Sequence, residues 1–208
     1  MECLNSIRYG VCEDTYLHVL QNLSQKDVEF FRSFLSVIPK PPLNSSSVTK
    51  QEVLDLYALQ QSERPQMRET IKVIDKELTK PFFNLCSMLK IDRLDLKVNQ
   101  CVDFGQTVSL FYKAHFNRPR PFQVSLFYTS KFAPMGSISA WTASYPSGHT
   151  IQAEVIYRMY CKAYPQHASE FREVANLISY SRLVGGFHFQ SDIEVGKYIV
   201  ELLMGDKL

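Results

Sequence analysis

Apolar residues in this chain recur every three or four positions, and that spacing constrains the fold more than any other feature of the sequence. One such segment carries Val28, Phe31 and Leu35 on one face and is opened by Ser24 and Asp27. Strand-type alternation of apolar and polar residues is scarce, so we predict an all-α protein, a compact helical bundle. Further helices are predicted at about 66–78, 81–91, 103–115, 148–163, 168–184 and 191–204.

The spacing of turn residues predicts one domain. Thr49 followed by Glu52 resembles a capping box at the start of another helix. The Pro and Ser residues at 39–47 are too few to separate two domains, and 208 residues suffice to bury a core, so we predict a single domain over 1–208. A long loop at 116–146 is rich in Pro, aromatic and Ser residues, and such loops are usually functional or disordered.

Composition excludes several classes of protein. A net charge of +2 gives no sign of a nucleic-acid groove. No uninterrupted apolar run reaches the roughly 18 residues of a membrane-spanning helix, and residues 1–8 lack the apolar core of a secretory signal. The 5 cysteines show no metal-ligand spacing and are predicted to be reduced thiols. We therefore expect a cytoplasmic protein without a transmembrane segment.

Three segments carry residues suited to chemistry, and the first is a cluster of cations. Lys113, His115, Arg118 and Arg120 lie at a predicted helix end that runs into a Pro-stiffened loop. Guanidinium groups bind the oxygens of a tetrahedral anion in pairs, and a lysine adds a point charge. The alternative is a solvated basic helix end without a ligand.

The second segment, Ser144 to Thr150, precedes a predicted helix. Gly148 allows backbone N–H groups to approach an anion closely, and the helix start adds its own unpaired donors. His149 would stand in the first turn, facing the same place. The alternative is an ordinary helix-capping turn with an incidental histidine.

The third segment runs from Ser181 to Asp192. Arg182 lies near the apolar stripe of its helix, where a charge is costly unless an anion pairs with it. His188 and Asp192 are four residues apart, which places them on one helix face. A carboxylate bonded to one ring nitrogen leaves the other nitrogen as a nucleophile, although such a pair also occurs as a purely structural hydrogen bond.

Taken in order, these segments resemble the signature of the type 2 phosphatidic acid phosphatase superfamily, which also contains the vanadium haloperoxidases. The resemblance covers residues 113–192 and implies the all-helical bundle of that superfamily, while the first hundred residues carry no motif. The pattern K-x6-RP is met by Lys113, Arg120 and Pro121, PSGH by Pro146 to His149, and SR-x5-H-x3-D by Ser181, Arg182, His188 and Asp192.

The resemblance implies a metal-independent phosphatase that forms a phosphohistidine on His188. By similarity, Asp192 orients His188, and His149 protonates the leaving alcohol. No cofactor is expected, and vanadate should inhibit. The implied phosphate-binding residues are Lys113, Arg120, Ser147, Gly148 and Arg182.

Residues near the motifs have expected positions as well. Arg118 is expected at the pocket rim, because the motif spacing selects Arg120 as the ligand. Three aromatic residues of the long loop either wall the leaving group or belong to the core, and these are Phe122, Trp141 and Tyr145.

The expected substrate is a small soluble phosphate monoester. Residues 144–150 are similar to the corresponding stretch of soluble acid phosphatases, and a lipid phosphate at a membrane surface is the open alternative. A vanadium-dependent haloperoxidase is a rival function, which the short length of the chain disfavours. A catalytically inactive anion-binding helical protein is another, and the presence of His149, His188 and Asp192 disfavours it.

Overall fold

A computed structural model describes residues 2–10 and 20–205 of the chain. The described residues form helices joined by loops and contain no strand, which confirms the all-α prediction. No helix within these ranges is both long and apolar enough to cross a membrane. The helices are α1 (Glu2–Ser6), α3 (Gln25–Ser33), α4 (Ser47–Ser62), α5 (Arg64–Lys76), α6 (Lys80–Leu89), α7 (Asp95–Phe116), α8 (Pro121–Val124), α9 (Gly148–Ala163), α10 (Ala168–Val184) and α11 (Gln190–Met204), with short 3-10 turns at Ser125–Phe127 and Pro165–His167.

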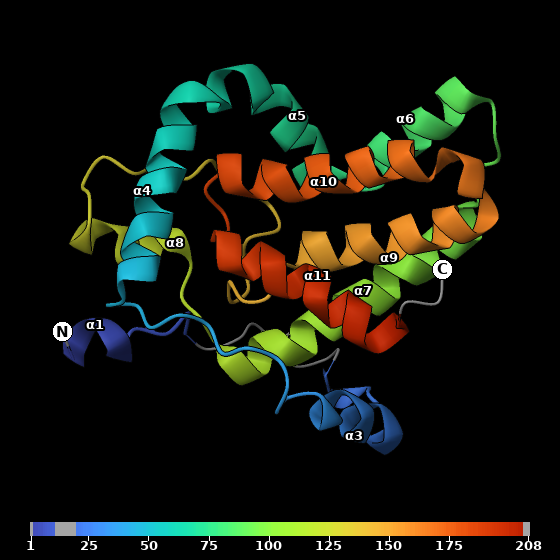
Figure 1. The fold of residues 1–208 in the computed structure, drawn as a ribbon. Coiled ribbons are helices and arrows are strands. Elements are labelled where there is room, and N and C mark those ends of the chain that lie inside the picture. Colours follow the sequence, from blue (N-terminus) through green and yellow to red (C-terminus); the bar gives the residue numbers. More distant parts are fainter. Residues whose placement is uncertain (1, 11–19, 206–208) are drawn as a thin grey trace.

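Helix α9 is the centre of the bundle. It packs against α7, α10 and α11, and α5 and α6 pack on α10 from the other side. Figure 1 shows α4 and α5 arching over one end of these helices, with α8 overlapping the lower part of α4 in this view. Because α9 touches three neighbours, its first residues are held in a fixed place relative to the ends of α7 and α10.

Both sides of α9 are buried in apolar clusters. On one side Tyr160 stacks on Phe171 with ring centroids 4.3 Å apart, and Phe82 completes the stack. On the other side Ile151 packs with Tyr112 and Ile199. Burying a large apolar side chain contributes about 1.5–3 kcal/mol, so these clusters together fix the position of α9.

Of the two predicted helix starts, one is confirmed and the other is wrong. Ser24 caps α3, since its hydroxyl accepts a hydrogen bond from the Asp27 amide at 3.1 Å. The capping box predicted at Thr49 and Glu52 is wrong, because α4 begins earlier, with Ser46 as its cap. Glu52 is buried and binds a distant partner, described below.

The long loop predicted at 116–146 contains short helices. Its first part forms α8 and the 3-10 turn that follows, and the remainder runs without regular structure to the start of α9. The other predicted helices are present, with ends shifted by a few residues and with α7 beginning well before residue 103.

Candidate active site

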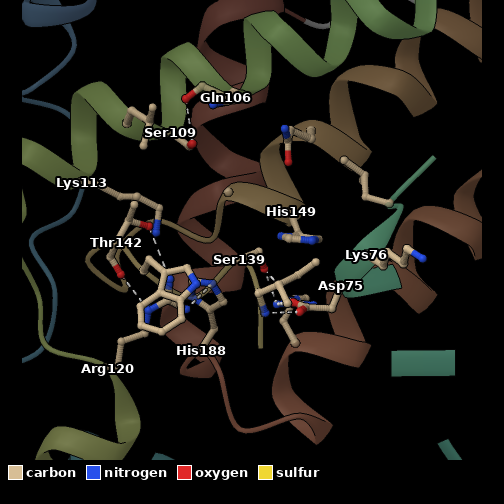
Figure 2. A pocket seen from close by; sticks show the side chains of 17 residues that line it. Asp75, Lys76, Gln106, Ser109, Lys113, Arg120, Ser139, Thr142, His149 and His188 are labelled. Atoms are coloured by element: carbon tan, nitrogen blue, oxygen red, sulfur yellow. Dashed lines mark hydrogen bonds and ion pairs between the residues drawn. The ribbon is translucent and has the colours of Figure 1, made fainter. Parts of the chain in front are cut away.

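The three motif segments meet at one cavity of about 440 Å³. The end of α7, the start of α8, the first turn of α9, the end of α10 and the turn before α11 all contribute to its walls. Figure 2 shows the side chains that line it. The lining residues named by the sequence motifs are Lys113, Arg120, Gly148, His149, Arg182 and His188.

His188 is held by a hydrogen bond at each ring nitrogen. Its Nδ1 lies 3.3 Å from the Asp192 carboxylate, and its Nε2 lies 3.1 Å from a guanidinium nitrogen of Arg120. An arginine can only donate, so Nε2 is the acceptor and the ring proton sits on Nδ1. Burial first, and then the charges of Arg120 and Lys113, lower the pKa of His188 well below its usual value. The ring is therefore neutral, and its Nε2 lone pair faces Arg120 at the wall of the cavity.

Asp192 is fully buried and yet ionised. Burial alone raises the pKa of a carboxyl, but the charge of Arg118 and the hydrogen bonds from His188 and Ser144 outweigh it, so the pKa of Asp192 lies well below its usual value. The Phe189 amide also donates to this carboxylate at 2.9 Å. The surrounding donors keep the charge in place beside the imidazole.

Arg118 does not lie at the pocket rim, so that prediction is wrong. Its side chain is 1% exposed, and it binds Asp192 at 2.7 Å and Glu52 at 3.0 Å. Its guanidinium stacks 3.9 Å above the Phe189 ring. Two carboxylates hold Arg118 on the far side of the His188–Asp192 pair, where it supports Asp192. Glu52 also accepts the Ser191 amide at 2.7 Å, which ties α4 to the start of α11.

Three cations face the cavity, and all are almost completely buried. Lys113 donates to the carbonyls of Ala143 and Ser144, and Arg120 donates to the carbonyl of Thr142 at 2.8 Å. Burial, followed by repulsion from Arg182, lowers the pKa of Arg120 to about 10. Burial and then the charge of Arg120 lower the pKa of Lys113. These three basic side chains, opposed by the single carboxylate of Asp75, thus line the cavity.

Arg182 has two hydrogen-bond donors without a partner among the described residues. Its Nη2 binds Asp75 at 2.7 Å, whereas its Nε and Nη1 are buried and find no hydrogen-bond partner in the described part of the chain. An unpaired buried donor costs free energy, and an anion in the cavity would relieve that cost. The geometry thus favours a ligand with several acceptor oxygens.

Asp75 is a site residue that the sequence motifs missed. It lies near the end of α5 and lines the cavity, where it accepts hydrogen bonds from Ser139 at 2.6 Å and from Ser137 at 2.8 Å. Burial raises its pKa, but Arg182 and the hydroxyl donors outweigh that effect and lower the pKa to about 2. No signal in its own helix distinguishes Asp75 from a surface acid, because its partner Arg182 is 107 residues away.

The start of α9 brings His149 to the cavity. Burial and the nearby charge of Arg182 lower the pKa of His149 well below its usual value. A Cβ on Gly148 would lie 3.2 Å from the Ser109 hydroxyl, so glycine permits the close approach of α7. Ser147, expected to bind phosphate, instead caps α9: its hydroxyl accepts from the Thr150 amide at 3.4 Å, and it does not line the cavity.

The aromatic residues of the loop separate into walls and core. Trp141 is 58% exposed and lines the cavity. Tyr145 is buried, and its hydroxyl donates to the Pro39 carbonyl at 2.6 Å, so it belongs to the core. Phe122 lines a smaller neighbouring cavity that shares Trp141 with the first.

The sequence of this chain is similar to those of known acid phosphatases. Non-specific acid phosphatases of Salmonella typhimurium (strain LT2) and Salmonella typhi are each 30% identical over 87 residues, which are 42% of this chain and 34% of theirs. The matched stretch thus spans about a third of these curated relatives.

A solved structure shares the fold. It is the first transmembrane PAP2 type phosphatidylglycerolphosphate phosphatase from Bacillus subtilis, with a TM-score of 0.51 at 21% identity, covering 90% of this chain and 91% of that one. A sequence profile of the PAP2 superfamily matches residues 98–204. That range is more than half of the chain and contains all three motif segments, and the protein therefore belongs to the PAP2 superfamily.

Proposed function

We propose that this protein is a phosphatase that hydrolyses phosphate monoesters through a phosphohistidine formed on His188. The observation that carries the proposal is the geometry of one ring: the Nε2 of His188 is a buried, neutral nitrogen whose lone pair meets Arg120 in a cavity lined by cations. Membership of the PAP2 superfamily and the likeness to acid phosphatases support the same reaction.

In the first step the Nε2 lone pair of His188 attacks phosphorus in line with the leaving oxygen. The N–P bond forms as the P–O bond to the alcohol breaks, and the alcohol oxygen takes a proton from His149. The positive charge that develops on the His188 ring is stabilised by Asp192, 3.3 Å from Nδ1. Lys113, Arg120 and Arg182 stabilise the equatorial oxygens, which is the main requirement of phosphoryl transfer.

His149 needs a proton before it can act as an acid. Burial and the charge of Arg182 lower its pKa. A bound phosphate dianion acts in the opposite direction, because a nearby negative charge favours the imidazolium. The substrate itself would therefore raise the pKa of His149 and supply the acid in its working state.

The second step releases phosphate. The neutral His149 accepts a proton from a water molecule as the water oxygen attacks phosphorus, and the P–N bond breaks to return the electron pair to His188. The three buried cations supply positive charge in the place where many phosphatases use metal ions, so we propose that neither step needs a metal. In the described ranges, no group of three or more His, Cys, Asp or Glu side chains is arranged to hold one.

The test is hydrolysis of 4-nitrophenyl phosphate by the purified protein with and without EDTA. Activity should survive the chelator and be inhibited by vanadate, and His188→Ala should abolish it while leaving the circular-dichroism spectrum unchanged. Acid-labile, alkali-stable 32P label on the wild-type protein after rapid quenching should be absent from His188→Ala. Turnover by the alanine variant, or loss of activity with EDTA, would contradict the mechanism. Bromide oxidation with peroxide and vanadate serves as the haloperoxidase control.

A further inference from the structure

We propose that Gln106 and Gln152 form a leaving-group subsite that selects alcohols bearing further hydroxyl groups over apolar alcohols. The inference rests on the proposed phosphatase function and adds the part of the substrate that the phosphate-binding residues do not touch. Both side chains line the large cavity, and no motif of the sequence contains them.

The cavity is larger than a phosphate group requires. Its volume of about 440 Å³ lies in the range of sites that enclose a whole small molecule. In-line displacement places the leaving group opposite the attacking nitrogen of His188. The proposed acid, His149, must lie beside the leaving oxygen, so the alcohol extends into the part of the cavity beyond His149. In the view of Figure 2, His188 and Arg120 lie toward one end of the site and Gln106 toward the other.

Helices α7 and α9 place the two glutamines in that outer part. Gly148 of α9 lies against Ser109 of α7, with Lys113 nearby, and Gly105 of α7 lies against Gln152 of α9, so the helices run antiparallel along the cavity. Gln152 is four residues beyond Gly148, and Gln106 is seven residues before Lys113. At a rise of 1.5 Å per residue, Gln152 lies about 6 Å along α9 from Gly148, and Gln106 lies about 10 Å along α7 from Lys113. That distance is the reach of an alcohol of several atoms.

The contact at Gly105 fixes one of these amides. A Cβ on Gly105 would lie 2.8 Å from the Cγ of Gln152, so only glycine allows this approach of the helices. The Nε2 of Gln152 donates to the Val102 carbonyl at 3.2 Å, which orients the amide and leaves its oxygen without a partner among the described residues.

Gln106 completes the subsite with an amide that has both hydrogen-bonding groups available. Its side chain is exposed at the cavity, and within the described ranges no side-chain hydrogen bond engages it. A carboxamide both donates and accepts, and one with a free oxygen accepts, so the pair matches hydroxyl groups rather than a hydrocarbon. Leu110, one turn after Gln106 on α7, adds an apolar surface for the carbon skeleton.

A second cavity of about 250 Å³ is the alternative place where an apolar leaving group could bind. It shares Trp141 with the first cavity and is lined by Phe122, Met135 and Phe187. None of its walls comes from His149, Gln106 or Gln152. An alcohol protonated by His149 therefore belongs in the first cavity, and the two cavities give different predictions for ligand preference.

Binding to His188→Ala tests the subsite without requiring turnover. Calorimetry would compare glucose 6-phosphate, hexyl phosphate and inorganic phosphate. We expect glucose 6-phosphate to bind most tightly, and Gln106→Ala in the same background to weaken it by about 2- to 10-fold, the usual effect of one hydrogen bond. Hexyl phosphate and inorganic phosphate should change by less than about 2-fold.

Matched variants separate the subsite from general effects. Gln152→Met keeps the side-chain length and should weaken the same ligand. Gln51→Ala removes an exposed glutamine that donates to Asp55 on α4, outside the cavity lining, and it should leave the binding of all three ligands unchanged. Tighter binding of hexyl phosphate that Phe122→Ala weakens would place the leaving group in the second cavity and overturn the proposal. Equal losses for all three ligands in Gln106→Ala would also overturn it.

Failure of the proposed function would look different. If the wild-type protein does not hydrolyse 4-nitrophenyl phosphate while glucose 6-phosphate binds in the glutamine-dependent way, the reaction is wrong and the subsite holds. If none of the three ligands binds, the anion site is wrong and the subsite is overturned with it.

Discussion

Replacing Arg118 by methionine should destabilise the protein more than any surface substitution. Arg118 makes ion pairs of 3.0 Å with Glu52 and 2.7 Å with Asp192, and the three side chains are 1%, 8% and 0% exposed. Removing one partner of a buried pair leaves an uncompensated charge, which costs about 3–5 kcal/mol. Here two carboxylates lose their partner at once, so we expect the free energy of unfolding at pH 7 to fall by at least about 3 kcal/mol.

The pH dependence of that loss has a definite sign. Arg118 is the largest favourable influence on the lowered pKa of Asp192. A carboxyl with a lowered folded pKa stabilises the fold above its unfolded pKa of about 3.9, and this contribution disappears as the pH falls toward the folded pKa. The difference in stability between wild type and Arg118→Met should therefore be full at pH 7 and shrink below about pH 4.

Urea unfolding followed by circular dichroism measures the effect, and a second substitution tests its cause. Glu52→Gln in the Arg118→Met background removes one stranded charge, so the double variant should be more stable than Arg118→Met alone. Lys72→Met, which removes an exposed pair with Glu69, should leave the unfolding midpoint nearly unchanged. The reasoning is refuted if Arg118→Met loses no more stability than Lys72→Met, or if the double variant is the least stable of the set.

Three further predictions concern the titrating groups and the helix contact. Folding lowers the pKa values of His149 and His188, so the unfolded chain takes up protons first as the pH falls. The free energy of unfolding should therefore fall below about pH 6.5, by up to about 1.4 kcal/mol per pH unit for each ring. Urea midpoints that stay constant between about pH 7.5 and pH 5 would contradict this. Asp75 raises the pKa of His149, so Asp75→Asn should move the alkaline limb of the kcat profile to lower pH, and a limb that stays in place would remove Asp75 from the acid's environment. Gly105→Ala would bring its Cβ within 2.9 Å of the Gln152 Cα and should lower the free energy of unfolding by about 1–3 kcal/mol. Thermal unfolding should show this as a lower Tm, and an unchanged Tm would mean that α7 and α9 can move apart without loss.

The sequence predicted those parts of the site that depend on local structure. A four-residue spacing places His188 and Asp192 together once a helix is assumed, and the turn before Gly148 predicts the helix that begins there. These short-range arrangements depend only on neighbouring residues and not on how the rest of the chain packs. The apolar spacing likewise predicted most of the helices, because it reports which face each helix buries.

The parts that escaped prediction depend on partners distant in sequence. Glu52 lies 66 residues from Arg118 and Asp75 lies 107 residues from Arg182, and no periodicity links such positions. Glu52 was mistaken for a cap residue because a Thr followed by a Glu satisfies the local pattern, although Ser46 takes that role. Arg118 and Arg120 have the same local context, so only the two carboxylates that surround Arg118 distinguish a supporting residue from a cavity residue.

The two sets of charges around His188 have complementary tasks. In front of the ring, Lys113, Arg120 and Arg182 outnumber the single carboxylate of Asp75, so this side favours a dianion. Behind the ring, Glu52 and Asp192 outnumber Arg118, so this side favours a positive charge on the imidazole. In the proposed reaction, attack on phosphorus places positive charge on the ring and negative charge on the leaving oxygen in front of it, and both sides are already charged to receive these changes. The fixed, buried arrangement thus lowers the energy of the charge-separated state without reorganisation, which is where electrostatic catalysis has its largest effect.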